Sequence, residues 1–169
     1  MRVCLIIDAG YMASIQRKIG AIDFLKLKNL IEEKYGKVVR GYYITSLDTN
    51  NQASFHSWIK SANGPKLEVV VKDQKAKSCP SCGNLYNVEK GIDVAISTLA
   101  IKGAHRDVYD TLALINGDGD LLDALQYVRD DLGREVIIVG ELESISTDLQ
   151  ALASGVLSLP DYIQEIGKI

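Results

Sequence analysis

The chain has 169 residues, of which 47% are hydrophobic, so length and composition favour one globular domain with a sizeable core. The net charge of −3 and the isoelectric point near 5.4 argue against a protein that coats nucleic acid through a broad basic surface, because such binding displaces many phosphate counterions. No apolar run approaches the roughly 18 residues of a membrane span, and the N-terminus lacks the layout of a signal peptide, so we expect a cytoplasmic protein.

The first predicted elements are a buried strand and an amphipathic helix. Residues 3–7 form a short apolar run that ends at Asp8, which is typical of a strand buried on both faces. In residues 23–35 the apolar side chains recur at helical spacing. Asp23 stands where it can cap the start of this helix, and Gly36 lies just past its end.

Strands and helices then alternate along the chain. Residues 38–45 are rich in β-branched and aromatic side chains and predict a strand, and 51–61 place three large apolar residues on one helical stripe. Residues 67–71 predict a third strand. A polar, lysine-bearing loop at about 73–88 then precedes a long predicted helix at 89–102.

The C-terminal part continues this alternation. Residues 111–115 predict a fourth strand, which runs into the acidic sequence Asn116-Gly117-Asp118-Gly119-Asp120, and 135–139 predict a fifth. Three further helices are predicted, at 121–132, 146–153 and 161–166. Helical crossovers between strands predict an α/β fold, a three-layer sandwich with a mainly parallel central sheet. We expect residues 1–169 to form a single domain with the loop at 73–88 as an insertion.

The candidate functional residues are acids at strand exits. Asp8 follows the first strand, and Asp118 and Asp120 follow the fourth. In an open α/β sheet the functional crevice lies beyond the carboxyl ends of the strands, so these acids converge if the two strands are neighbours. Asp93 stands near the start of the helix that precedes the fourth strand, at the border of its apolar stripe, from where it can reach the same crevice.

A cluster of carboxylates needs a compensating cation. Two carboxylates about 5 Å apart repel by roughly 3 kcal/mol at an effective dielectric constant of about 20. Magnesium prefers carboxylate and water oxygens and keeps open positions for phosphates, so the cluster indicates metal-assisted phosphoryl chemistry. Each acid also has a purely structural interpretation, since Asp8 and Asp118 stand at possible helix caps and Asp93 and Asp120 in first helical turns.

Three blocks of sequence resemble a known family. They are Ile6-Ile7-Asp8, the run Lys90-Gly91-Ile92-Asp93-Val94-Ala95, and the acidic run at 116–120. In this order they resemble the NYN domain in its LabA-like branch, which is similar to PIN nucleases. The resemblance implies a PIN-like sheet, RNA cleavage, and a Mg²⁺ or Mn²⁺ site with Asp8, Asp93 and Asp118 as ligands and Asp120 as a fourth catalytic acid.

The match also has departures from the family pattern. The family often carries an asparagine shortly after the first aspartate, whereas this chain has Ala9-Gly10-Tyr11-Met12. After the last acidic pair the family commonly has phenylalanine and then proline, whereas Leu121 and Asp123 stand here. Leu121 should still pack in the core, and Asp123 has no support as a ligand.

Cationic residues near the acids are candidates for contact with substrate. Lys90 lies three residues before Asp93, on nearly the same predicted helical face, and is expected to contact phosphate unless it is an ordinary exposed lysine. The loop carries Lys72, Lys75 and Lys77 with Tyr86 nearby. These residues either guide single-stranded RNA by charge and stacking or simply solvate the loop.

The loop also carries a cysteine pair, Cys79-Pro80-Ser81-Cys82. Tetrahedral zinc needs four ligands and no second pair is present, so an intrachain site is not evident. Two pairs facing each other across a homodimer would make a four-cysteine zinc site; the alternatives are a reduced thiol pair and a redox-labile turn. Cys4, within an apolar strand, is interpreted as a core residue.

Two other functions remain open at this level. A haloacid dehalogenase-like phosphatase would also have a Gly-Asp-Gly-Asp run after a strand, but it needs a second aspartate where this chain has Gly10. A non-catalytic RNA-binding or protein-interaction module would keep the sheet and use the acids only structurally. Metal-dependent cleavage of RNA discriminates between these alternatives.

Overall fold

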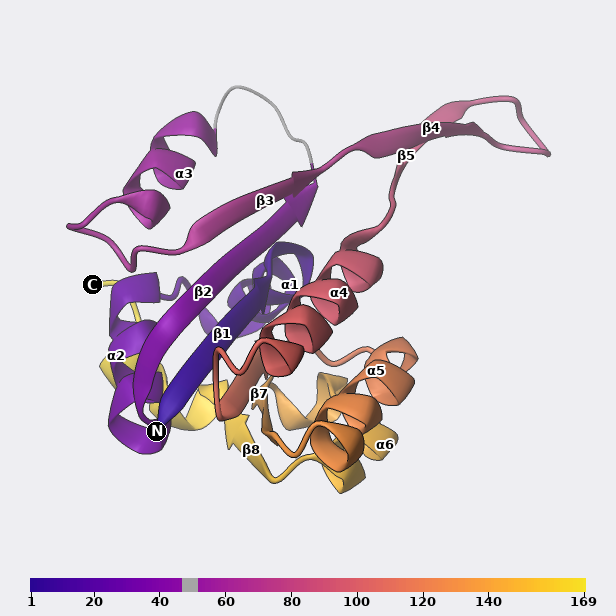
Figure 1. Cartoon of the computed structure of the whole chain (residues 1–169). Coiled ribbons are helices and arrows are strands. Elements are labelled where there is room, and N and C mark those ends of the chain that lie inside the picture. Colours follow the sequence, from indigo (N-terminus) through magenta and orange to yellow (C-terminus); the bar gives the residue numbers. More distant parts are fainter. Residues whose placement is uncertain (47–51) are drawn as a thin grey trace.

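The computed structural model describes residues 1–46 and 52–169, and its centre is a six-stranded sheet (Figure 1). The strands are β1 (Arg2–Asp8), β2 (Lys37–Ser46), β3 (Glu68–Lys72), β6 (Thr111–Ile115), β7 (Glu135–Gly140) and β8 (Gly155–Ser158). Their spatial order is β3-β2-β1-β6-β7-β8, and every neighbouring pair is parallel. The prediction of a parallel α/β sheet is therefore confirmed.

Helices cover both faces of this sheet. One face carries α1 (Ala9–Ile19), α2 (Phe24–Tyr35), α3 (Ala53–Lys60) and α7 (Ile163–Ile166), and the other carries α4 (Ile92–His105), α5 (Leu122–Gln126) and α6 (Thr147–Leu152). Alternate side chains of β1 divide between two cores: Leu5 packs with the first layer and Ile6 with the second. The three-layer sandwich is thus confirmed. Among the helices of the described residues, none has the length and apolar character to cross a membrane.

Several local predictions can be compared with the structure. Asp23 caps α2 by accepting hydrogen bonds from the backbone N–H groups of Leu25 and Lys26, and Gly36 ends the helix with a φ of 117°, as expected. The helix α4 begins at Ile92 rather than at residue 89, because Gly91 adopts a left-handed conformation with a φ of 83° just before it.

Other elements differ from the prediction. The predicted helix at 121–132 consists of a 3₁₀ turn, the short α5 and a π-helical turn at Tyr127–Asp131. Neither α1 nor β8 was predicted from the sequence. Helix α1 begins directly after β1 with no intervening turn, and β8 has only 4 residues at the sheet edge. Asn51, included in the helix predicted at 51–61, lies outside the described residues.

The segment predicted as a loop at 73–88 is a β-hairpin. Its strands are β4 (Gln74–Ser78) and β5 (Leu85–Glu89), which pair antiparallel with each other in a separate two-stranded sheet. The hairpin projects away from the sandwich (Figure 1). Almost all of its side chains are exposed, so the sequence carries no alternation of buried and exposed residues by which strands are recognised.

The chain order of the strands creates a crevice at the middle of the sheet. From β1 the chain moves outward to β2 and β3 and then returns past β1 to β6, so the direction of winding reverses between β1 and β6. At such a switch point the connections leave on opposite faces and open a space beyond the carboxyl ends of the two strands. Ile7 pairs with Ile115, so Asp8 and Asn116 emerge side by side into this space.

The loop after β6 depends on Gly117. A Cβ atom at this position would overlap the backbone carbonyl of Ser144, whereas a Cβ atom at Gly119 would lie 3.3 Å from the rotatable hydroxyl of Ser146. We therefore expect Gly117→Ala to lower the free energy of unfolding by about 1–3 kcal/mol, the usual cost of overpacking. Urea denaturation checks this value. Gly119→Ala is the matched control, and equal losses in the two variants would contradict the assigned contact.

Candidate metal centre

Asn116 joins the two strand exits. Its side-chain Nδ2 donates a hydrogen bond to Asp8 Oδ2 at 2.8 Å, and its Oδ1 accepts one from the backbone N–H of Asp118 at 2.7 Å. The residue is 2% exposed, so its side-chain amide is buried, where an unpaired amide would be costly. The sequence analysis assigned Asn116 no role, although a buried polar residue directly after an apolar strand is a usable signal.

Asp8 caps a helix, which is the structural role that its position after the first strand allowed. Its Oδ1 accepts hydrogen bonds from the backbone N–H groups of Gly10 at 2.9 Å and Tyr11 at 3.2 Å, so it caps α1. With the bond from Asn116, both carboxyl oxygens have protein donors. These contacts hold the carboxylate in one orientation at the mouth of the crevice.

Three other aspartates form the tightest group. One carboxylate oxygen of each of Asp93, Asp118 and Asp120 lies within 4.8 Å of the others, and this is the only such group of three acids, histidines or cysteines found over residues 1–46 and 52–169. Asp93 is half-buried in the first turn of α4, while Asp118 and Asp120 are exposed on the loop after β6. Asp118 also caps the 3₁₀ turn by accepting the N–H of Asp120 at 2.9 Å.

Asp93 and Asp118 open onto a pocket of about 350 Å³ that is also lined by Asp8. The charged side chain of Glu89, the last residue of β5, also lines this pocket. Glu89 Oε1 accepts a hydrogen bond from the Ser46 hydroxyl at 2.7 Å, and that hydroxyl in turn accepts one from Gln74 at 3.1 Å. The base of the hairpin therefore places a fifth carboxylate beside the four predicted ones.

The structure thus brings the four predicted catalytic acids close together but separates them into two kinds. Asp93, Asp118 and Asp120 approach one another closely enough to share an ion, and Asp8 lies on the wall with its oxygens bonded to protein. Lys90 lies between β5 and α4, is exposed, and does not line the pocket, so its expected place on a helical face with Asp93 is wrong. Its predicted contact with phosphate stays a prediction.

Comparison with known protein families assigns the fold. The NYN domain profile matches residues 2–160. This chain belongs to the NYN domain family. The predicted resemblance is confirmed at that level, and the LabA-like branch stays a prediction.

A solved structure supports the fold of this NYN domain. The crystal structure of a protein of unknown function from Vibrio parahaemolyticus superposes with a TM-score of 0.73 at 18% identity, over 94% of this chain and 92% of that chain. At this identity the likeness concerns the fold alone. A comparison with curated proteins finds no match. NYN domains belong to the PIN-like nuclease superfamily.

The electrostatics of the pocket favour a bound cation. Burial raises the pKa of Asp93, and the neighbouring Asp118, Asp120 and Glu89 raise it further. Burial also raises the pKa of Asp8, opposed by the N–H groups of Tyr11 and Gly10 and assisted by Glu89 and Asp93. The donors are all oxygens, and three of them converge on one small volume, which suits a hard divalent cation such as Mg²⁺ or Mn²⁺.

These shifts predict how stability depends on pH without metal. A carboxyl whose pKa is raised on folding holds its proton more tightly in the folded state, so stability falls as pH rises from the ordinary value of 3.8 through the raised one. Removing the charge with Asp93→Asn should therefore raise the midpoint of thermal unfolding at pH 7 in a chelating buffer. The gain should vanish below the ordinary pKa, where the wild-type carboxyl is protonated.

The matched control for this measurement is Asp123→Asn, which removes an exposed first-turn carboxylate of α5 outside the group of three. Its melting midpoint should show no comparable gain at pH 7. A lower midpoint for Asp93→Asn than for the wild type in chelator would show that the ionised Asp93 stabilises the fold, contrary to the repulsion assigned to it.

Proposed function

We propose that this NYN domain is a divalent-metal-dependent ribonuclease that hydrolyses RNA phosphodiester bonds in the pocket at the switch point of its sheet. The observation that carries the proposal is the convergence of Asp93, Asp118 and Asp120 within 4.8 Å beside Asp8. Without a cation, the mutual repulsion of these carboxylates lowers the stability of the fold. The family belongs to a nuclease superfamily, and carboxylate-bound Mg²⁺ or Mn²⁺ is well suited to phosphoryl chemistry.

In this proposal Asp93, Asp118 and Asp120 hold the ion. When bound, Mg²⁺ or Mn²⁺ supplies charge stabilisation for the phosphate and lowers the pKa of water. Asn116 keeps the loop of Asp118 in register with β1, since it bonds both to that loop and to Asp8. Substitution of a residue that orients metal ligands through hydrogen bonds typically lowers metal affinity or activity about 10–100-fold.

The geometry favours Asp8 as the acceptor of the proton from the attacking water. Its carboxylate is held by Gly10, Tyr11 and Asn116, so it cannot rotate freely, and it faces the pocket. Because burial raises its pKa, it is a stronger base than an ordinary surface carboxylate. The role of metal ligand expected from the family resemblance stays a prediction for Asp8.

We propose single-stranded RNA as the substrate class, and the hairpin as its guide. The register of β4 and β5 pairs Lys77 with Tyr86 and Lys75 with Val88, so both lysines and the tyrosine share one face of the hairpin. Tyr86 is 48% exposed and has an open aromatic face. Lysines that contact phosphates beside an aromatic ring that stacks on a base are a common way to bind a single strand without sequence preference.

A second hollow continues the site on the other side of the acids. It has a volume of about 490 Å³, runs along α4, and shares Asp93 and Asp120 with the candidate centre. Its remaining lining includes Val94, Thr98 and Lys102. A strand of RNA that crosses the acids would therefore contact the base of the hairpin on one side and this largely apolar hollow on the other.

The first test is cleavage of RNA by purified protein with added Mg²⁺ or Mn²⁺. Asp118→Asn should lower kcat/KM at least about 100-fold, because loss of even an outer-shell contact commonly costs 10–100-fold. Asp123→Asn, whose carboxylate lies outside the group, should retain wild-type activity. The single-turnover rate on a labelled RNA, with and without chelator, measures both.

The outcome of this test also separates the alternative functions. RNA binding without cleavage at any divalent metal would favour a non-catalytic RNA-binding module. Hydrolysis of phosphomonoesters but not of RNA would favour the haloacid dehalogenase-like phosphatase, whose required second acid is replaced here by Gly10. Cleavage that is equal in the wild type and Asp118→Asn would place the chemistry elsewhere.

The role of the hairpin has its own test. The double variant Lys75→Ala/Lys77→Ala should raise KM and reduce the slope of log K against log salt by about 1.4, the value for two phosphate contacts in a single strand. Tyr86→Ala should weaken binding by about 1–3 kcal/mol if a base stacks on the ring. Fluorescence anisotropy with a labelled single strand measures both effects.

The control for the lysines is Lys28→Ala/Lys37→Ala, since Lys37 begins β2 at the opposite edge of the sheet from the acids and both residues line a separate hollow. The control should leave the salt slope unchanged. If the two double variants behave alike, the hairpin contributes only general positive charge and is not the guide.

A further inference from the structure

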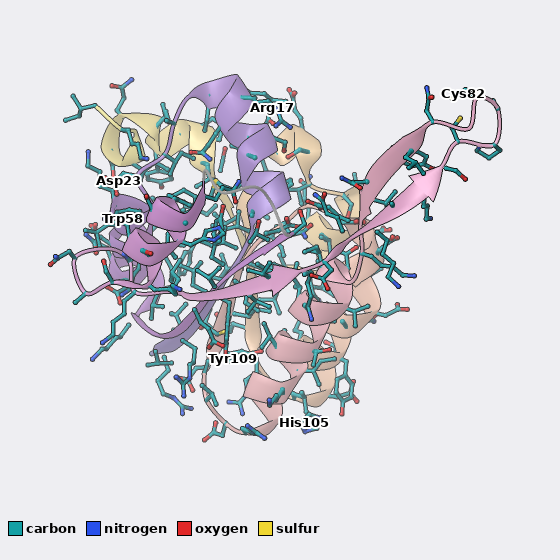
Figure 2. The ribbon with its side chains drawn as sticks, turned by 90° about the horizontal axis from the view of Figure 1, so that it is seen from above. Arg17, Asp23, Trp58, Cys82, His105 and Tyr109 are labelled. Atoms are coloured by element: carbon teal, nitrogen blue, oxygen red, sulfur yellow. The ribbon has the colours of Figure 1, made fainter. Side chains whose placement is uncertain are left out.

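The hairpin of β4 and β5 is poorly supported by the rest of the described chain. Its strands pair only with each other, and it extends beyond the sandwich, with Cys82 at its far end (Figure 2). Leu85 is 77% exposed and Tyr86 48% exposed, so its larger apolar side chains have little cover. A two-stranded hairpin without a packed face is marginally stable in water, which indicates that something outside the single chain stabilises this one.

The tip of the hairpin is a tight turn that carries both cysteines. The backbone N–H of Cys79 donates to the carbonyl of Asn84 at 2.8 Å, and the N–H of Gly83 donates to the carbonyl of Cys79 at 2.8 Å. Gly83 completes the turn with a φ of 71°, a conformation that favours glycine. Cys79 and Cys82 are both free thiols, three positions apart, which is a spacing common among zinc ligands.

Positive charge lies close to the cysteine pair. The thiolate, not the thiol, is the metal ligand. Lys75 and Lys77 lie on the adjoining strand, and the only acid in β4 and β5 is Glu89 at the far base, so negative charge gathered at the tip would be offset.

One chain does not complete a metal site at this tip. Over residues 1–46 and 52–169, no group of three converging acids, histidines or cysteines includes Cys79 or Cys82. Tetrahedral zinc in structural sites takes four protein ligands. Because Cys82 is exposed and Cys79 partly exposed at the end of a projecting hairpin, a second copy of the same pair can approach them without hindrance from the sandwich (Figure 2).

We propose that Cys79 and Cys82 from two copies of this chain bind one zinc ion, which joins the two hairpins tip to tip. Four thiols lose their protons to solvent, and four sulfur–zinc bonds form with a formal charge of −2 on the site. The lysines of both copies offset this charge, and the contact covers Leu85 of each copy. The site is distinct from the aspartate group and does not depend on the ribonuclease proposal.

The test uses the full-length protein purified under reducing conditions, with zinc added in the presence of excess Mg²⁺ so that the acidic pocket competes little for it. We expect one zinc per two chains by elemental analysis and twice the chain mass by light scattering. Cobalt in place of zinc should give the charge-transfer absorption of thiolate ligands. A strong zinc chelator should return the protein to the mass of one chain.

Cys82→Ser is the disrupting variant and Ser81→Ala, which keeps both thiols in the same turn, is its matched control. Cys82→Ser should lose both the zinc and the doubled mass, with an unchanged melting midpoint of the sandwich. Ser81→Ala should keep both. One zinc per single chain, absence of zinc from the wild type, or a zinc-bound dimer that persists in Cys82→Ser would each overturn the proposal.

Discussion

The candidate site depends on one buried amide. Asn116 connects the end of β1 to the loop after β6 by bonding to Asp8 on one side and to the backbone of Asp118 on the other. Parallel pairing brings the two strand ends to the same edge of the sheet, but it does not by itself orient the side chains that follow them. The amide supplies that orientation, because an unpaired polar group at this depth would cost more than either hydrogen bond gains.

The carboxylates around this amide lower the stability of the fold electrostatically. Asp93, Asp118 and Asp120 repel one another, Glu89 adds a further charge, and partial burial raises the pKa of Asp93 and of Asp8. Asp8 and Asp118 each have a local structural function as a helix cap, but caps alone do not require convergence. The convergence of carboxylates at a switch point creates a repulsion that a divalent cation would relieve.

The hairpin links the chemistry of the pocket to the exterior. Its base holds Glu89 against Ser46 beside the acids, its strands present Lys75, Lys77 and Tyr86 on one face, and its tip carries the cysteine pair. A contact between two tips would therefore join two hairpins, each of which has the acids of its own chain at its base. The same sixteen-residue element, β4 through β5, would then serve substrate contact along its length and association at its end.

From the sequence alone, five of the six strands of the central sheet and four of the five acids beside the candidate site could be assigned. Continuous apolar runs such as residues 3–7 and 111–115 can only be buried on both faces, and such strands, separated by helices, predict a parallel sandwich. Local signals also located the caps of α2 at Asp23 and Gly36. The acidic strand exits followed directly from these assignments, because the residue after a strand must lie at the sheet edge.

Only the tertiary structure decided how the acids are grouped. Strand order is a long-range property, so the adjacency of β1 and β6, the bridging role of Asn116 and the separation of Asp8 from the group of three could not be obtained from local patterns. The hairpin escaped prediction because it buries almost nothing, and strand periodicity is visible in a sequence only where one face is hidden from water. The place of Glu89 in the pocket could not be predicted either, because its contact with Ser46 spans 43 residues and leaves no local sequence pattern.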